Sequence, residues 1–279
     1  MSRRVGIAAG VIALWLGGLA MLAKREMFGG EAARLAHAAL FVAPGAQYYA
    51  VWQGDRQVGF ASSTIDTTAR SFVISDQFIA RIPADDSTQR VVARSTAVLT
   101  RTLQLRSFAY EVRRGGAAHQ LLGTILGDSL VSLRTISGES KGQVRLVRLD
   151  GPLLVPGMVP MVIALGQEPK VGASRTASIF DPLTDSLASV TVNVVSESLF
   201  VVVDSATRDT RSQRWVAAHS DTVRAWRIEQ QGGGMLTGWI DGRGRMIEAE
   251  PLGPMAMRQT AYEIAFHNWM DDSTEANTR

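Results

Sequence analysis

The stretch FVISDQFIARI at residues 72–82, followed by RVVARSTAVL at residues 90–99, decides the fold. In both stretches apolar and polar side chains alternate, and a period of two is typical of a strand with one buried face. The polar segment between them, which contains Asp85 and Asp86, is too short for the crossover that parallel strands need. The two stretches are therefore predicted to form antiparallel strands of one sheet.

The same alternation continues on both sides of this pair. Turns are indicated at Gly54-Asp55, Gly115-Gly116 and residues 241–244 (DGRG). Further strands are predicted at residues 48–53, 58–66, 103–112, 120–126, 130–136, 144–149, 176–180, 188–195, 200–203, 214–219, 224–230, 236–240 and 246–250. The predicted fold class is mainly β: an antiparallel curved sheet or open barrel with a short apolar helix, preceded by one transmembrane helix.

A curved sheet has a concave face that must be covered. Residues 151–166 (GPLLVPGMVPMVIALG) begin with a proline-punctuated stretch and continue as a short apolar helix at residues 158–165. This segment is far too short to be a second membrane span. We predict that it fills the sheet as core, with a lipid-contacting or hinge role as the alternative.

The N-terminal block is apolar and long enough to cross a membrane. Residues 5–23 (VGIAAGVIALWLGGLAMLA) contain no charged side chain and would extend roughly 28 Å as a helix. The alternative is a cleaved signal peptide, with Arg3 and Arg4 as its basic region and residues 18–20 as the cleavage site. Because the apolar run continues to Lys24, we favour an anchor.

The basic residues at the two ends of this helix give only a slight preference for orientation. We place the domain outside, because its β-rich composition resembles extracytoplasmic modules. The predicted location is the bacterial inner membrane, single-pass, with a periplasmic domain.

Small side chains on adjoining faces of this helix would let another helix approach closely. They are Gly6, Ala9, Gly10, Ala13 and Gly17. Trp15 lies mid-span and is predicted to pack against a neighbouring helix or a cofactor-bearing protein. Alternatively, Gly and Ala are simply common in transmembrane helices.

The predicted organisation has four parts: an anchor at residues 1–25, an amphipathic connector at 26–46, a β-rich extracytoplasmic domain at 47–258, and a C-terminal helix with a disordered tail at 259–279. In the connector, Leu35 and Leu40 share one helical face. In the C-terminal helix, Tyr262, Phe266 and Trp269 form a stripe that either docks on the core or contacts a partner.

Composition excludes several functions. Of the 29 Lys and Arg side chains, four flank the apolar block, leaving 25 against 26 acidic side chains, so the domain shows no basic surface for nucleic acid. There is no cysteine, and His37, His119, His219 and His267 are scattered singly without a catalytic or metal-binding motif. The sequence thus predicts no catalytic residue, metal or cofactor, and a protein that is not an enzyme; an enzyme of unrecognised class is the third alternative.

Several short motifs occur in the order found in one known family: Trp52-Gln-Gly54 with Val58-Gly59-Phe60, then residues 150–153 (DGPL), 180–184 (FDPLT), 239–245 (WIDGRGR) and 251–253 (PLG). This stretch resembles the β-rich region that precedes the catalytic core in bacterial membrane-associated transglutaminase-like proteins. Since the chain lacks the cysteine of that core, the resemblance implies the accessory domain alone, serving as a platform for contacts.

Two functions follow as predictions. The first is a non-enzymatic, membrane-anchored accessory subunit that packs on integral membrane proteins of a larger complex, such as a photosynthetic or respiratory assembly. The second rests on a looser resemblance to the half-barrel of periplasmic lipoprotein carriers, and is a module that binds membrane lipid or a lipoprotein.

Overall fold

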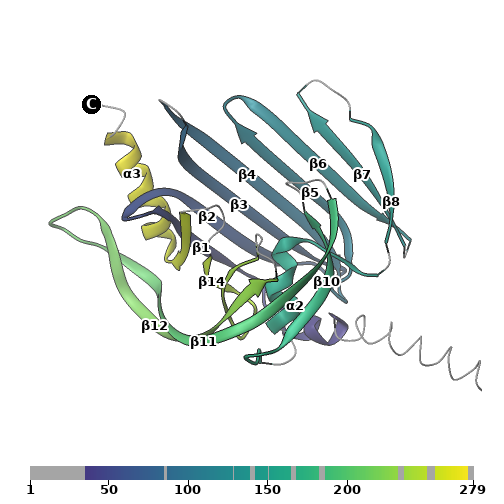
Figure 1. Cartoon of the computed structure of the whole chain (residues 1–279). Helices are drawn as coiled ribbons and strands as arrows, with labels where there is room; N and C mark the ends of the chain where they lie inside the picture. The colour runs from purple at the N-terminus through teal and green to yellow at the C-terminus, as the bar shows by residue number, and fades with distance from the viewer. Residues whose placement is uncertain are drawn as a thin grey trace, which may run out of the picture.

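A single curved sheet dominates the computed structural model (Figure 1). The structure describes residues 35–84, 87–127, 129–138, 142–149, 151–164, 168–181, 186–231, 236–249 and 255–275. Within these residues, 15 strands lie in the order β8-β7-β6-β5-β4-β3-β2-β1-β15-β14-β13-β12-β11-β10-β9. The sheet curves strongly without closing into a barrel, so the predicted mainly β, curved-sheet class is confirmed.

The first eight strands form an antiparallel meander, in which each strand pairs with the next along the chain. They are β1 (Gly45–Gln53), β2 (Arg56–Thr67), β3 (Ser71–Ala84), β4 (Ser87–Thr100), β5 (Leu105–Arg114), β6 (Ala117–Leu126), β7 (Leu130–Ser137) and β8 (Val144–Arg148). Each contains a segment predicted as a strand from alternation.

The second half of the sheet begins with β9, which pairs in parallel with β10. All the other strand pairs of this half are antiparallel. Its strands are β9 (Leu153–Leu154), β10 (Ser174–Asp181), β11 (Ser186–Arg208), β12 (Trp215–Gln230), β13 (Gly238–Asp241), β14 (Met246–Ala249) and β15 (Met255–Thr260). The halves meet where β15 pairs with β1, joining Tyr48 to Thr260.

The segment after β9 fills the concave face. A 3-10 helix, η2 (Pro156–Met158), leads into α2 (Val159–Ala164), and most of their side chains belong to the main core. We call residues 153–164 the plug. Phe180 of β10 and Phe108 of β5 lie 5.1 Å apart between ring centroids, from opposite halves of the sheet. The prediction that the apolar segment packs as core is confirmed.

Burial follows the alternation of the sequence. In β7, Val131 and Leu133 are buried, whereas Leu130 and Arg134 are exposed. Burying a side chain of this size contributes about 2 kcal/mol of transfer free energy. In strands such as β7, placing alternate residues toward the core therefore helps to hold the register, because a slip of one residue would expose them.

The C-terminal boundaries differ from the prediction. Residues 255–260 form β15, so the helical segment begins after Thr260 rather than at residue 259. It consists of a π-helix, η3 (Glu263–His267), and α3 (Asn268–Glu275), which continues into the stretch predicted as a disordered tail. Gln259 is in a strand rather than a helix because its backbone pairs with Tyr49 of β1. Local periodicity in the sequence does not reveal such a distant partner.

The N-terminal part is described only from residue 35. Residues 35–38 are helical and continue into a 3-10 helix, η1 (Ala39–Phe41). Leu35 is buried, but Leu40 is exposed, contrary to the shared face that was predicted, because the tighter last turn changes the angular spacing. Among the described residues no helix is long and apolar enough to span a membrane. The predicted anchor lies outside them.

The turn between β13 and β14 touches the plug and provides a test of this packing. Gly244 has a φ of +73°, and a Cβ placed there would lie 2.6 Å from Met161 Cα and 2.7 Å from the Pro160 carbonyl oxygen. Gly244→Ala should therefore lower the free energy of unfolding by about 3 kcal/mol or more, as measured by urea denaturation.

The matched control is Gly172→Ala, because Gly172 has a φ of +87° with nothing within 4 Å of the added Cβ. Backbone strain alone should cost about 1–2 kcal/mol there. Equal losses for the two variants would contradict a close contact between the turn and the plug.

Candidate functional site

A row of polar side chains crosses the concave face beneath the plug. Direct cross-strand pairing places Gln47 of β1, Ser63 of β2, Asp76 of β3, Ser95 of β4 and Tyr110 of β5 side by side. Each lies on the face that carries buried apolar side chains of the same strands. We call these five residues the concave polar row.

Asp76 is the charged centre of this row. Ser63 Oγ donates to Asp76 Oδ1 at 2.6 Å, and Ser95 Oγ donates to Oδ2 at 2.8 Å. The plug passes directly above, since a Cβ on Gly157 would lie 3.0 Å from Oδ2. Burial raises the pKa of Asp76 above its ordinary value, although both hydroxyl hydrogen bonds oppose that rise. Burial, then the nearby Asp76 charge, raises the pKa of Tyr110.

Among the described residues, no histidine base accompanies the two serines of this row. Within the described residues, the hydrogen bonds of Asp76 come from Ser63 and Ser95 alone, and no histidine joins them. A serine nucleophile needs a base positioned to take its proton. Here both hydroxyls instead donate to the carboxyl group of the buried Asp76.

The second candidate region is a long two-stranded extension of β11 and β12. Neighbouring strands cover only their base, because β10 pairs with residues 186–193 of β11 and β13 pairs with residues 225–228 of β12. Beyond this base, residues 199–208 of β11 and 215–224 of β12 pair only with each other among the described strands. We call this extension the arm; it curves below the sheet in Figure 1.

The arm is fastened to the C-terminal helical segment. Asn268 makes two backbone hydrogen bonds with Trp215: its Oδ1 accepts from the Trp215 N–H at 2.9 Å, and its Nδ2 donates to the Trp215 carbonyl at 2.9 Å. The Trp215 and His267 rings stack with centroids 5.9 Å apart. Because Asn268 is buried, these bonds form away from water and fix the end of the arm.

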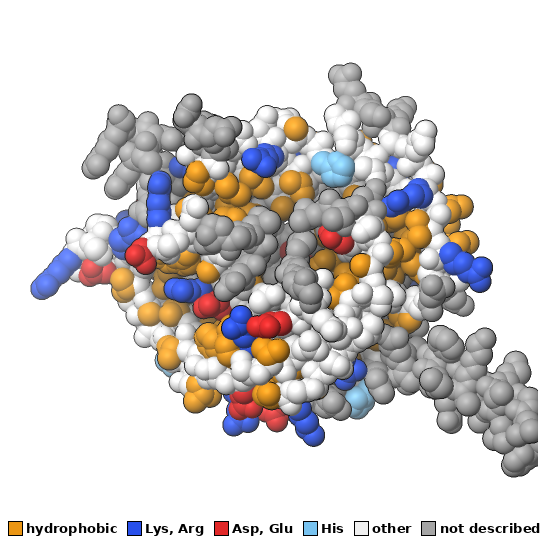
Figure 2. Space-filling model, in the orientation of Figure 1, with side chains coloured by type: hydrophobic (Ala, Val, Ile, Leu, Met, Phe, Trp, Pro, Cys, Tyr) orange, Lys and Arg blue, Asp and Glu red, His pale blue; other side chains and the backbone are white. Residues whose placement is uncertain are grey.

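One face of the arm exposes large aliphatic side chains. Leu199 is 67% exposed and Val201 is 73% exposed, and both lie on the same face of β11. Polar and charged neighbours surround them: Arg224 pairs with Leu199 across the strands and forms an ion pair with Glu197 at 3.4 Å. Figure 2 likewise shows apolar patches bordered by basic and acidic side chains. An apolar patch with a charged rim is typical of a protein contact surface.

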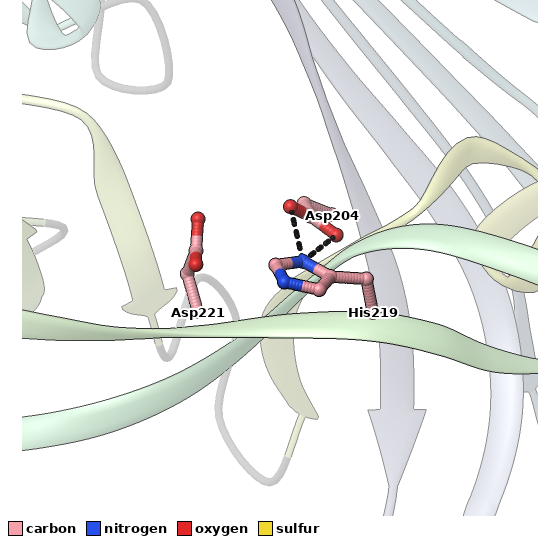
Figure 3. A group of neighbouring side chains, drawn as sticks. All are labelled: Asp204, His219 and Asp221. Atoms are coloured by element: carbon pink, nitrogen blue, oxygen red, sulfur yellow. Dashed lines mark hydrogen bonds and ion pairs between the residues drawn. The ribbon is translucent and has the colours of Figure 1, made fainter.

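A second feature of the arm is the cluster of Asp204, His219 and Asp221 (Figure 3). The pairing register shifts on both sides of Ser205, leaving Asp204 in a bulge opposite His219. Bulges of this kind redirect a side chain. His219 Nδ1 lies 2.8 Å from Asp204 Oδ2, and the three residues offer ligand atoms within 4.8 Å of one another.

The electrostatics of this cluster are those of an ion pair. The hydrogen bond to Asp204, then the charges of Asp204 and Asp221, raise the pKa of His219. The hydrogen bond from His219 is the main cause that lowers the pKa of Asp204. Two carboxylates and an imidazole are chemically suitable ligands for a divalent cation. All three are exposed, however, and we interpret the cluster as a surface ion pair that stiffens the arm.

The aromatic stripe, which was predicted either to dock on the core or to contact a partner, packs on the chain's own sheet. Phe266 contacts Phe60 with ring centroids 5.3 Å apart, Tyr262 contacts Tyr48 at 5.0 Å, and Trp269 is buried. Tyr262 is the most exposed of the three. A partner role for the stripe stays a prediction, as does helix packing through Gly6, Ala9, Gly10, Ala13, Trp15 and Gly17, which lie outside the described residues.

Sequence reasoning missed both polar groups. Neighbours in the concave polar row come from five strands, so only the register brings them together. For the cluster of Asp204, His219 and Asp221, the sequence holds one clue: His219 and Asp221 are two residues apart, which places them on the same face of a strand. Asp204 could not be added, because its position depends on a bulge.

No protein-family model matches the chain, and no curated protein matches it. One similar solved structure is the crystal structure of a beta-barrel-like protein of the domain of unknown function DUF1849 from Brucella abortus. It is 12% identical, covers 78% of this chain and 94% of that chain, and has a TM-score of 0.47. We base no functional argument on it.

The raised pKa of Asp76 makes stability depend on pH. The unfolded chain ionises near the ordinary value of 3.8, whereas the folded chain holds the proton to higher pH. Between these values the folded state binds more protons, so the free energy of unfolding should fall as pH rises above 3.8. Asp76→Asn should remove that slope in urea denaturation between pH 4 and pH 7. The control Asp66→Asn, at an exposed carboxylate, should leave it in place.

The Asp204–His219 pair gives a second titration. Nuclear magnetic resonance should show the His219 pKa above the ordinary value of 6.5, falling toward it in Asp204→Asn. Asp221→Asn should lower it less, because that residue acts through its charge without a hydrogen bond. Since the folded pKa is the higher one, the pair's stabilisation is present below pH 6.5 and is lost as pH rises through the folded pKa. An unchanged pKa in Asp204→Asn would refute the pairing.

Proposed function

We propose that the protein is a non-enzymatic accessory subunit that packs on integral membrane proteins of a larger complex and contacts them through the arm. The observation that carries the proposal is the exposure of Leu199 and Val201 on a rigid two-stranded extension. Exposing two large aliphatic side chains is unfavourable in water, and covering them with a partner returns that free energy.

The way the arm is held supports a binding role. The bonds between Asn268 and Trp215 fix its end, and the base is continuous with the main sheet. A pre-organised surface loses less conformational entropy on binding than a mobile hairpin does. The predicted N-terminal anchor would hold this surface near other membrane proteins, and the resemblance to an accessory region of transglutaminase-like proteins suggests a platform for contacts.

A half-barrel that binds lipid or a lipoprotein is the second candidate. The plug favours it, because Met158 and Met161 place flexible, adaptable side chains in the concave face. Both side chains are buried, however, so an acyl chain would have to displace the plug. The first proposal requires no such rearrangement and is therefore preferred.

Native purification tests both candidates. The full chain would be extracted from its own membranes in mild detergent, and mass spectrometry would identify the proteins and lipids that co-migrate with it. A stoichiometric set of membrane proteins is expected for the wild type. The double variant Leu199→Ser/Val201→Ser should lose that set, because its polar side chains no longer favour burial.

The control is Val144→Ser/Leu146→Ser on the edge strand β8, where the two side chains are 53% and 61% exposed. This variant should retain the partners. Loss of partners from both double variants alike would contradict a contact through the arm. A lone chain carrying stoichiometric lipid would instead support the half-barrel carrier.

A further inference from the structure

A cavity of about 130 Å³ opens beside the plug, apart from the arm. The segment between η1 and β1 forms one wall, and Met161 of α2 and the β13–β14 turn complete it. The lining includes Phe41, Gln47, Ser63, Met161, Arg243 and Arg245. Part of this lining is apolar and part is polar, so the cavity suits a ligand with two kinds of surface.

Gln47 supplies an unused hydrogen-bond donor. Its Oε1 accepts from the Tyr49 hydroxyl at 3.0 Å, but its Nε2 is buried and has no partner among the described residues. A buried N–H without an acceptor is costly, and native structures seldom leave one. The neighbouring Ser63 hydroxyl donates to Asp76 and keeps lone pairs that could accept, but it forms no hydrogen bond with Gln47 Nε2. Because this nitrogen exposes almost no surface, a ligand acceptor could satisfy it only after the Gln47 side chain turns toward the cavity.

Two arginines give the cavity its charge. Arg245 Nε lies 2.6 Å from Oδ2 of the buried Asp241, so these two charges offset each other. Arg243 uses its backbone N–H for Asp241 Oδ1 at 2.9 Å, whereas its guanidinium has no carboxylate partner within the described part of the chain. One positive charge is therefore left over at the cavity, together with a donor-rich guanidinium plane.

We propose that this cavity binds a small acidic amphiphile. Its carboxylate or phosphate oxygens contact Arg243 and, once the Gln47 side chain turns toward the cavity, Gln47 Nε2, and its apolar body lies against Met161 and Phe41. A cavity of about 150 Å³ accommodates a benzene ring, so this cavity of about 130 Å³ can hold most of a ring while the acidic group lies at its opening. The inference goes beyond both functions proposed above: it needs neither a partner on the arm nor displacement of the plug. A soluble acid and the headgroup of an acidic lipid share this chemistry.

Calorimetric titration of the full chain with benzoate tests the site, with benzamide as the neutral counterpart. Benzoate should bind at least tenfold more tightly, because only the anion complements Arg243. Arg243→Ala and Gln47→Leu should each weaken benzoate binding tenfold or more. The control Arg106→Ala, which removes an exposed arginine of β5, should leave it unchanged. Circular dichroism melting checks that each variant folds.

Equal binding of benzoate and benzamide, or benzoate affinity that survives both cavity variants, would overturn the proposal. Inorganic phosphate binding as tightly as benzoate would overturn the amphiphile assignment, since phosphate has no apolar body. Vesicles then distinguish the source: retention on phosphatidylglycerol but not phosphatidylcholine, lost in Arg243→Ala, assigns the acid to a lipid. Benzoate binding without such retention assigns it to a soluble molecule. Loss of partners from the arm affects none of these outcomes.

Discussion

The need to cover the concave face of an open sheet governs this structure. A strongly curved antiparallel sheet presents one apolar surface that no neighbouring sheet can reach, and the chain covers it with its own plug. Phe108 and Phe180 meet from opposite halves of the sheet, and the plug residues pack beside them. Because this packing fills most of the concavity, binding is left to what lies outside it: the arm, and the small cavity beside the plug.

Much of this architecture is accessible from the sequence, because alternation reports directly which side of a strand is buried. Every strand of the first half was predicted, and so was the plug. Two limits appear in the second half. The polar residues around Glu197 and Asp204 interrupt the apolar pattern of β11, so the sequence predicted two strands there, and β12 was likewise predicted as two strands. Each is one strand, and β11 continues through bulges. β15 was missed because its evidence lies in β1, far away in the sequence.

The candidate sites were less accessible for a related reason. Pairing along the concave polar row follows from register, and a shift of one residue in any strand would turn its member to the other face. Gln47 illustrates this: in the sequence it is one polar residue ahead of a strand, and its significance comes from an unpaired buried nitrogen. The exposure of Leu199 and Val201 likewise depends on β11 running beyond its neighbours, which composition does not reveal.

The pairing of β1 with β15 has a consequence for how the molecule is made. The two edges of the sheet, β8 and β9, are adjacent in the chain, whereas its central seam joins the first strand to the last. As the chain leaves the ribosome, the meander from β1 to β8 can assemble from local contacts alone. The plug can pack on this meander earlier, but strand pairing between the two halves must wait until residue 260 has been synthesised, because only then can β15 reach β1. Until then β1 presents a free edge, and the growing polypeptide carries an unfinished sheet through most of its translation.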